Sequence, residues 1–180
     1  MWPIGHASVA YLLYALSTRS RFDGPPGHGA TVAVGFASQV PDLIDKPLAW
    51  YLGVLPGGRT LAHSLFVLVP LSLVVYEFAR QRNVEEYGVA FAVGTLSHTL
   101  LDAFPILWNT ETPWEALFWP LLSPGGVSGE GAPTILGLFR DSLGQPYFLS
   151  EFCFLALALY VWRADGYPGL GPVIGRLSPA

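Results

Sequence analysis

Acidic and imidazole side chains recur inside the apolar stretches of this sequence. His98 and Asp102 are four residues apart, so on a helix they lie on one face about 6 Å apart. Asp42 and Asp45 are three residues apart and share a face in the same way if their segment is helical. Neutral imidazole and carboxylate groups are ligands for divalent metals such as zinc. The spacing therefore indicates a metal site.

Two further histidines extend this candidate set. His6 opens the first apolar stretch of the chain, and His63 opens the third, just after Arg59. The full set exceeds the four ligands of one tetrahedral zinc, so the sequence leaves open two metals, or one metal with Asp45 as general base. Arg59 is expected to hold an anionic head group, or only to anchor its helix at the membrane interface. The candidate metal ligands are His6, Asp42, Asp45, His63, His98 and Asp102.

Structural roles compete with metal binding at several of these positions. A lone histidine near a helix start, such as His6, is more often a packed or interfacial residue than a ligand. Asp45 can pair with Lys46 or Arg59, and prolines on both sides of it are typical of a turn. Glu151, near the start of the last apolar stretch, is expected to complement the positive N-terminus of its own helix, with membership of the site as the alternative.

The composition places these groups in a membrane protein. Of the 180 residues, 52% are hydrophobic and only 12% are charged, about half the roughly 25% usual for soluble domains. The mean hydropathy is +0.44. A net charge of −4 without a basic run argues against nucleic-acid binding, and the single cysteine, Cys153, excludes an internal disulfide framework and a zinc ribbon.

Five apolar stretches predict an all-α, polytopic membrane helical bundle of about five spans in one domain, 1–180. The stretches are 4–17, 30–55, 61–79, 87–108 and 147–162, with the last span reaching from 146 to 163. The first is short for a span, and prolines and charges interrupt the second. A Gly/Pro-rich segment, 109–146, contains an apolar island, 114–122, which we expect to be re-entrant or interfacial.

The basic residues predict the orientation of this bundle. Segments after the first, third and fifth stretches would share one side of the membrane and carry six arginines, against two on the other side. The positive-inside rule makes the first set cytoplasmic, which places all six candidate ligands at similar depth toward the extracytoplasmic side. The six are Arg19, Arg21, Arg80, Arg82, Arg163 and Arg176, and the two are Arg59 and Arg140.

The order of the polar motifs resembles a known family. The early histidine is followed by Pro41-Asp42-Leu43-Ile44-Asp45, then Thr60-Leu61-Ala62-His63-Ser64, then Ser97-His98-Thr99-Leu100-Leu101-Asp102, and finally Trp119-Pro120. Together, over residues 1–123, they resemble the prokaryotic membrane-bound metal-dependent hydrolases of the YdjM type, also described as LexA-binding inner-membrane-associated hydrolases. The histidine that often precedes the arginine of the second motif in that family is absent here, where Gly58 precedes Arg59.

The resemblance implies a function and a set of roles. It assigns the presumed metal-binding positions of the family to Asp42, Asp45, His63, His98 and Asp102, and its early histidine to His6. It also implies a multi-pass protein of the prokaryotic inner membrane, in contact with lipids, in which a metal-activated water attacks an ester or phosphoester, such as that of a lipid. A structural or sensory metal site, or a small metal or proton transporter, remain the alternatives.

Overall fold

The computed structural model describes residues 1–107, 114–123, 134–143 and 145–170, which form helices and connecting turns and contain no strand. The all-α prediction is therefore confirmed for this part of the chain. The longer helices are α1 (Pro3–Phe22), α2 (His28–Ala37), α3 (Val40–Lys46), α4 (Leu65–Gln81), α5 (Glu85–Ala103), α6 (Ile135–Ser142) and α7 (Pro146–Ala164). Short turns of helix are η1 (Pro47–Tyr51), η2 (Leu61–His63), η3 (Phe104–Leu107) and η4 (Trp114–Phe118).

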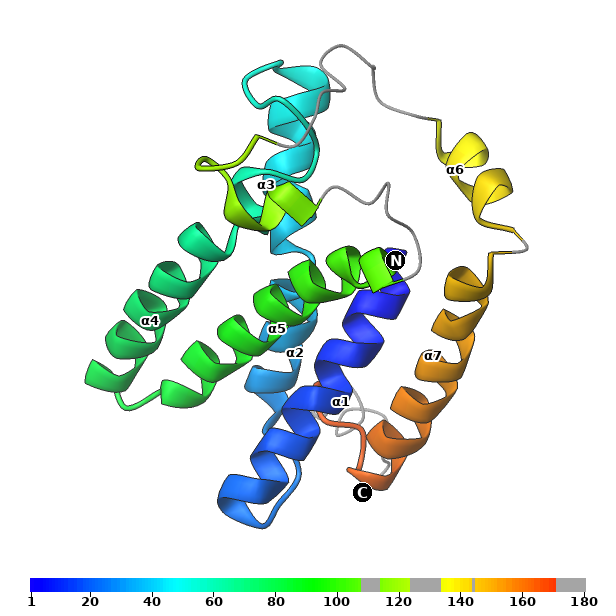
Figure 1. Ribbon diagram of the computed structural model, residues 1–180. Helices are drawn as coiled ribbons and strands as arrows, with labels where there is room; N and C mark the ends of the chain where they lie inside the picture. The colour runs from blue at the N-terminus through cyan, green and yellow to red at the C-terminus, as the bar shows by residue number, and fades with distance from the viewer. Residues whose placement is uncertain (108–113, 124–133, 144, 171–180) are drawn as a thin grey trace.

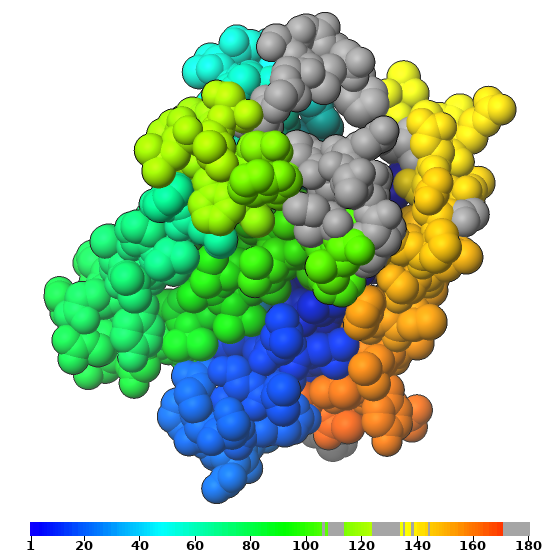
Figure 2. Space-filling model, in the orientation of Figure 1, coloured from blue at the N-terminus to red at the C-terminus, as the bar shows by residue number. Residues whose placement is uncertain are grey.

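Helix α1 lies at the centre of the bundle (Figure 1) and packs against α7, α5 and α2. Helix α5 packs along α4, which precedes it and runs in the opposite direction, and against α2. In the space-filling view the surface of α1 lies between those of α5 and α7 (Figure 2). The N-terminus, α3 and the C-terminal end of α5 lie toward the upper side of Figure 1, so this end of the bundle gathers the polar motifs.

The second apolar stretch does not form one helix. Its residues divide among α2, α3 and η1. Pro41 and Pro47 stand in the first turns of α3 and η1, where the missing N–H of proline is tolerated, whereas a proline within a continuous helix removes a hydrogen bond. The break turns the chain at Ser38 and Gln39 and carries Asp42 toward α5 and Asp45 toward η2.

Helix α7 is, within the described ranges, the one helix long and apolar enough to cross a membrane by length and composition. It has 19 residues, or about 28 Å at 1.5 Å a residue, close to the roughly 30 Å of a bilayer core. Helix α4 has 17 residues and spans about 26 Å. The arrangement of five spans therefore stays a prediction.

Many large apolar side chains lie on the surface of the bundle, while several ionisable side chains are buried. Large apolar side chains are exposed along α4 and α7, including Leu73 and Tyr160, which are 64% and 72% exposed. Charged and imidazole groups are buried instead: His6, Asp45, His63, His98, Asp102 and Glu151. An apolar surface this extensive marks an interface with another apolar phase or partner.

The absence of a side chain at Gly94 lets α5 approach the end of α2. A Cβ atom at this position would lie 2.7 Å from the Cβ of Ala37 and 2.8 Å from the backbone nitrogen of Ser38, closer than such atoms pack. Small residues permit such close helix contacts in membrane proteins. One turn after Gly94, His98 is thereby brought against the chain at Ser38.

Candidate metal centre

Four side chains from three segments converge at the upper end of the bundle. Asp42 comes from α3, His63 from η2, and His98 and Asp102 from successive turns of α5, as their spacing predicts. One ligand atom of each lies within 4.8 Å of those of the other three. The Nε2 atoms of His63 and His98 are both 3.6 Å from Asp42 Oδ1, and they are 3.7 and 3.9 Å from Asp102 Oδ2.

The facing atoms of this cluster fit a metal ion. Among the residues that the structure describes, His63 Nε2, His98 Nε2 and Asp42 Oδ1 are buried and have no hydrogen-bond partner. A buried polar atom without a partner is unfavourable, and a single cation would satisfy all three. Zinc bonds of about 2.0–2.1 Å imply tetrahedral edges of about 3.3 Å, a few tenths of an ångström shorter than the 3.6–3.9 Å between the histidine nitrogens and the aspartate oxygens here. The four residues can therefore hold a divalent ion after an inward movement.

The outer nitrogens of both histidines are held by acceptors. His98 Nδ1 donates to the carbonyl oxygen of Ser38 over 2.6 Å, which requires a proton on Nδ1 because a carbonyl can only accept. His63 Nδ1 lies 2.8 Å from Asp45 Oδ2. Both contacts leave the Nε2 lone pair facing the cluster, as is usual for metal-binding histidines, whose other nitrogen donates to a carboxylate or carbonyl.

Asp45 lies outside the four converging residues, in contrast to its expected place as ligand or base. Its side chain is fully buried, and Oδ1 accepts the backbone N–H of Ala62 over 2.9 Å. Oδ2 accepts the backbone N–H of Thr60 over 2.7 Å as well as contacting His63. Its oxygens are thus engaged with η2. The alternative, in which Asp45 pairs with Lys46 or Arg59, is not what the structure shows: Lys46 pairs with Asp42 and Arg59 with Asp102.

His6 lies beside the cluster rather than within it. Its ring stacks on that of His98, with centroids 3.7 Å apart and planes 19° apart. Its Nε2 is 3.2 Å from Asp102 Oδ1, an oxygen that also lies 3.0 Å from the amino group of Met1. Neither ring nitrogen of His6 has a well-formed hydrogen bond within the described part of the chain. Asp102 therefore faces His6 with one oxygen and the four-residue cluster with the other.

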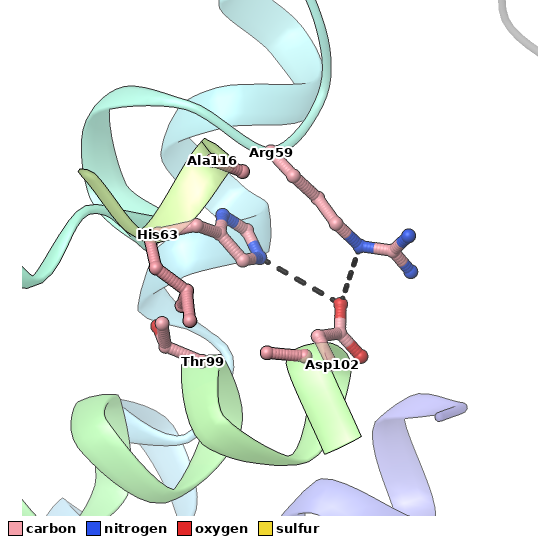
Figure 3. Close-up of a pocket in the computed structure, with 7 residues that line it drawn as sticks. Arg59, His63, Thr99, Asp102 and Ala116 are labelled. Carbon is pink, nitrogen blue, oxygen red and sulfur yellow. Dashed lines mark hydrogen bonds and ion pairs between the residues drawn. The ribbon is translucent and has the colours of Figure 1, made fainter. Parts of the chain in front are cut away.

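Arg59 reaches the cluster from the loop before η2. Its Nε donates to Asp102 Oδ2 over 2.7 Å, and the same oxygen faces His63 (Figure 3). The negative charge of Asp102 raises the pKa of the Arg59 guanidinium, which therefore stays positively charged. Its side chain is 47% exposed. Arg59 thus places a permanent positive charge between the buried carboxylate and the surface.

A small cavity adjoins the cluster at this point. It has a volume of about 20 Å³. A cavity needs about 10–15 Å³ to hold one water molecule, so this one has room for a water molecule but not for the head group of a lipid. The cavity is lined by Arg59, His63, Thr99, Asp102, Ala103, Ala116 and Leu117.

Comparison with known families shows which family the chain belongs to. A sequence profile of the YdjM inner membrane protein family matches residues 1–165. The chain belongs to this family. The predicted resemblance is confirmed, and the match extends beyond residue 123 to the end of α7. No curated protein matches the chain, and no solved structure matches it.

Two residues around the centre of this YdjM-family protein, Ser38 and Thr99, were not predicted. Ser38 contributes a backbone carbonyl, for which a sequence carries no signal. Thr99 lines the cavity. Its position directly after His98 in the sequence was a weak indication that it lies near the centre. Glu151, expected either to complement its own helix or to belong to the site, instead contacts another helix: its Oε1 accepts the backbone N–H of Trp2 over 2.9 Å, at the N-terminus of α1. Glu151 therefore ties α7 to the helix that carries His6.

Proposed function

We propose that this YdjM-family protein is a multi-pass, metal-dependent hydrolase that acts on an ester or phosphoester, with a lipid as the first substrate to test. The observation that carries the proposal is the convergence of buried atoms from Asp42, His63, His98 and Asp102, three of them without a hydrogen-bond partner in the described ranges. Zinc is the first metal to test, because two imidazoles and two carboxylates suit it.

The residues supply separate parts of a hydrolytic site. A divalent metal in this position acts as a Lewis acid and lowers the pKa of bound water toward neutrality. Asp45 and Ser38 orient the two histidines, so we assign Asp45 a positioning role in place of the general base expected from sequence. The Arg59 guanidinium, half-exposed beside the cavity, would hold an anionic group such as a phosphoester.

The placement of basic residues supports an extracytoplasmic site in a multi-pass bundle. Helices α1, α4 and α7 carry arginines in their last turns, and these ends all lie toward the lower side of Figure 1, opposite the metal cluster. The positive-inside rule would place that lower side in the cytoplasm. The exposed apolar side chains of α4 and α7 would then face lipid.

A structural metal site is the second candidate, because four protein ligands are typical of closed structural sites whereas catalytic zinc usually has three and a water. The surroundings of Asp102 favour a catalytic site over a structural one. Its Oδ2 already accepts a hydrogen bond from Arg59, and a cavity large enough for water adjoins it. We propose that Asp102 binds weakly enough to leave a coordination position for water.

Elemental analysis of detergent-purified protein tests the proposed centre. We expect His98→Ala or Asp102→Ala to lower bound metal at least tenfold while the protein still inserts into the membrane, because each removes a ligand from a buried charged cluster. His28→Ala is the matched control, since His28 lies in the first turn of α2, away from the cluster. Undiminished metal in both ligand variants, or none in the parent protein, would reject the centre.

Activity separates the two candidate functions. The parent protein and both ligand variants would be assayed with phospholipids and generic phosphoesters, with and without chelator. Hydrolysis that requires the metal and both ligands supports the hydrolase. Stoichiometric metal without hydrolysis of any of these substrates would favour the structural site.

A further inference from the structure

The small cavity beside the metal cluster is lined by both polar and apolar side chains. His63 and Asp102, two of the four converging residues, line one part of it, and Arg59 lines another. The remaining walls are Ala103, on α5, and Ala116 and Leu117, on η4, whose side chains offer no hydrogen bond. Thr99 therefore carries the one hydroxyl group among the described residues that line the cavity.

The hydroxyl of Thr99 is unusual among the buried threonines of this bundle. A threonine in a helix commonly donates its Oγ1–H to a carbonyl one turn earlier. Thr18 does so to Tyr14 over 2.9 Å, and Thr95 does so to Phe91 over 2.9 Å. Thr99, only 1% exposed, makes no such bond, and its Oγ1 has no partner among the residues described.

A buried hydroxyl without a protein partner is expected to bond to an ordered water. The cavity that Thr99 lines is large enough for one water, and that water would also be within reach of the two cluster residues lining the same cavity. A hydroxyl group can donate one hydrogen bond and accept two. Since Oγ1 of Thr99 gives no hydrogen to a carbonyl, its hydrogen is free to be donated to the oxygen of the water.

We infer that Thr99 is a positioning residue that donates a hydrogen bond to the reacting water of the proposed hydrolase. The inference rests on the proposed function and deepens it, because it names the group that fixes the water beside His63 and Asp102. A donor to the water oxygen also favours loss of a proton from that water, since the hydrogen bond is stronger to the negatively charged form.

The test compares Thr99→Val with Thr99→Ser in full-length, detergent-purified protein loaded with Co²⁺. Valine keeps the shape of threonine without the hydroxyl, and serine retains the hydroxyl. The visible absorption of Co²⁺ changes when coordinated solvent loses a proton, so its pH midpoint reports on the water without any substrate. We expect Thr99→Val to bind Co²⁺ with the parent stoichiometry and to raise the midpoint by about half to one pH unit, the equivalent of one lost hydrogen bond. Thr99→Ser should return the midpoint to the parent value.

Each other outcome overturns the inference in a distinguishable way. A Thr99→Val midpoint equal to that of the parent, with Co²⁺ bound, would remove the role of Thr99 and leave the proposed centre intact. Loss of Co²⁺ from Thr99→Val alone would make Thr99 a packing support of His98. A parent protein that binds no Co²⁺ would overturn both the inference and the proposed function.

Discussion

At the scale of single residues, the outer contacts of the histidines decide which atoms can bind a metal. A histidine offers a lone pair from Nε2 only when the proton sits on Nδ1. The carbonyl of Ser38 enforces this for His98, and the carboxylate of Asp45 favours it for His63. Asp45 is itself held by two backbone N–H groups, so the orientation of His63 is built into η2.

Replacing Asp45 with asparagine tests this arrangement. In Asp45→Asn the side-chain amide can offer its NH₂ group to His63 Nδ1, which moves the histidine proton to Nε2 and removes the lone pair from the centre. We expect metal affinity to fall about tenfold to a hundredfold, as is typical when such an outer partner is changed. Competition with a chromogenic chelator measures it. Asp42→Asn, which changes a proposed ligand, should lose at least as much, and an unchanged affinity in Asp45→Asn would contradict the positioning role.

At the scale of the helices, the site depends on how closely α2 and α5 approach. The close contact at Gly94 brings the end of α2 within hydrogen-bonding distance of His98. The relative position of His98 and Asp102 is set by their spacing in one helix. The contact of His98 with Ser38 is set by the distance between two helices. Packing between helices therefore controls which ring nitrogen of His98 carries the proton and which one faces the centre.

Gly94→Ala is expected to push these helices apart. The added Cβ would overlap Ala37 and the backbone of Ser38, and such overpacking costs about 1–3 kcal/mol. We expect a lower thermal unfolding midpoint in detergent and a weaker metal affinity, because the His98 contact lengthens. Gly35→Ala, in α2, is the matched control, since nothing lies within 4 Å of its added Cβ and alanine favours the helix. Equal effects of the two variants would show that the close approach is not required.

At the scale of the whole molecule, the bundle places buried charge at one end and basic helix ends at the other. Its exposed apolar side chains suit a lipid environment, and its buried carboxylates are compensated by neighbouring groups, Asp42 by Lys46, Asp102 by Arg59 and Asp45 by His63. Uncompensated carboxylates would oppose insertion by about 2.5–3.5 kcal/mol each. The mutual compensation of these groups is therefore also a condition for the proposed membrane topology.

Cysteine labelling in intact cells tests that topology. In a Cys153→Ser background, Ser123→Cys after η4 marks the site end, and Ser20→Cys in the last turns of α1 marks the basic end; both serines are exposed. Because we place the site outside, a membrane-impermeant maleimide should label Ser123→Cys in intact cells and Ser20→Cys only after lysis. The reverse pattern would invert the proposed orientation, and labelling of both in intact cells would refute the multi-pass arrangement.

The sequence alone determined the family, the helical class and the His98–Asp102 pair. Composition and hydropathy are sums over residues, and the spacing of two residues within one helix fixes their relative direction, so these features need no knowledge of the partner segments. Four of the six candidate ligands indeed converge in the structure. Only the tertiary structure decided that Asp42 rather than Asp45 faces the cluster, that Ser38 and Thr99 lie beside it, and that Glu151 ties α7 to α1. Those roles depend on distances between helices, which the spacing of residues within one helix does not give, and at Ser38 on a backbone carbonyl, which is the same for every residue type.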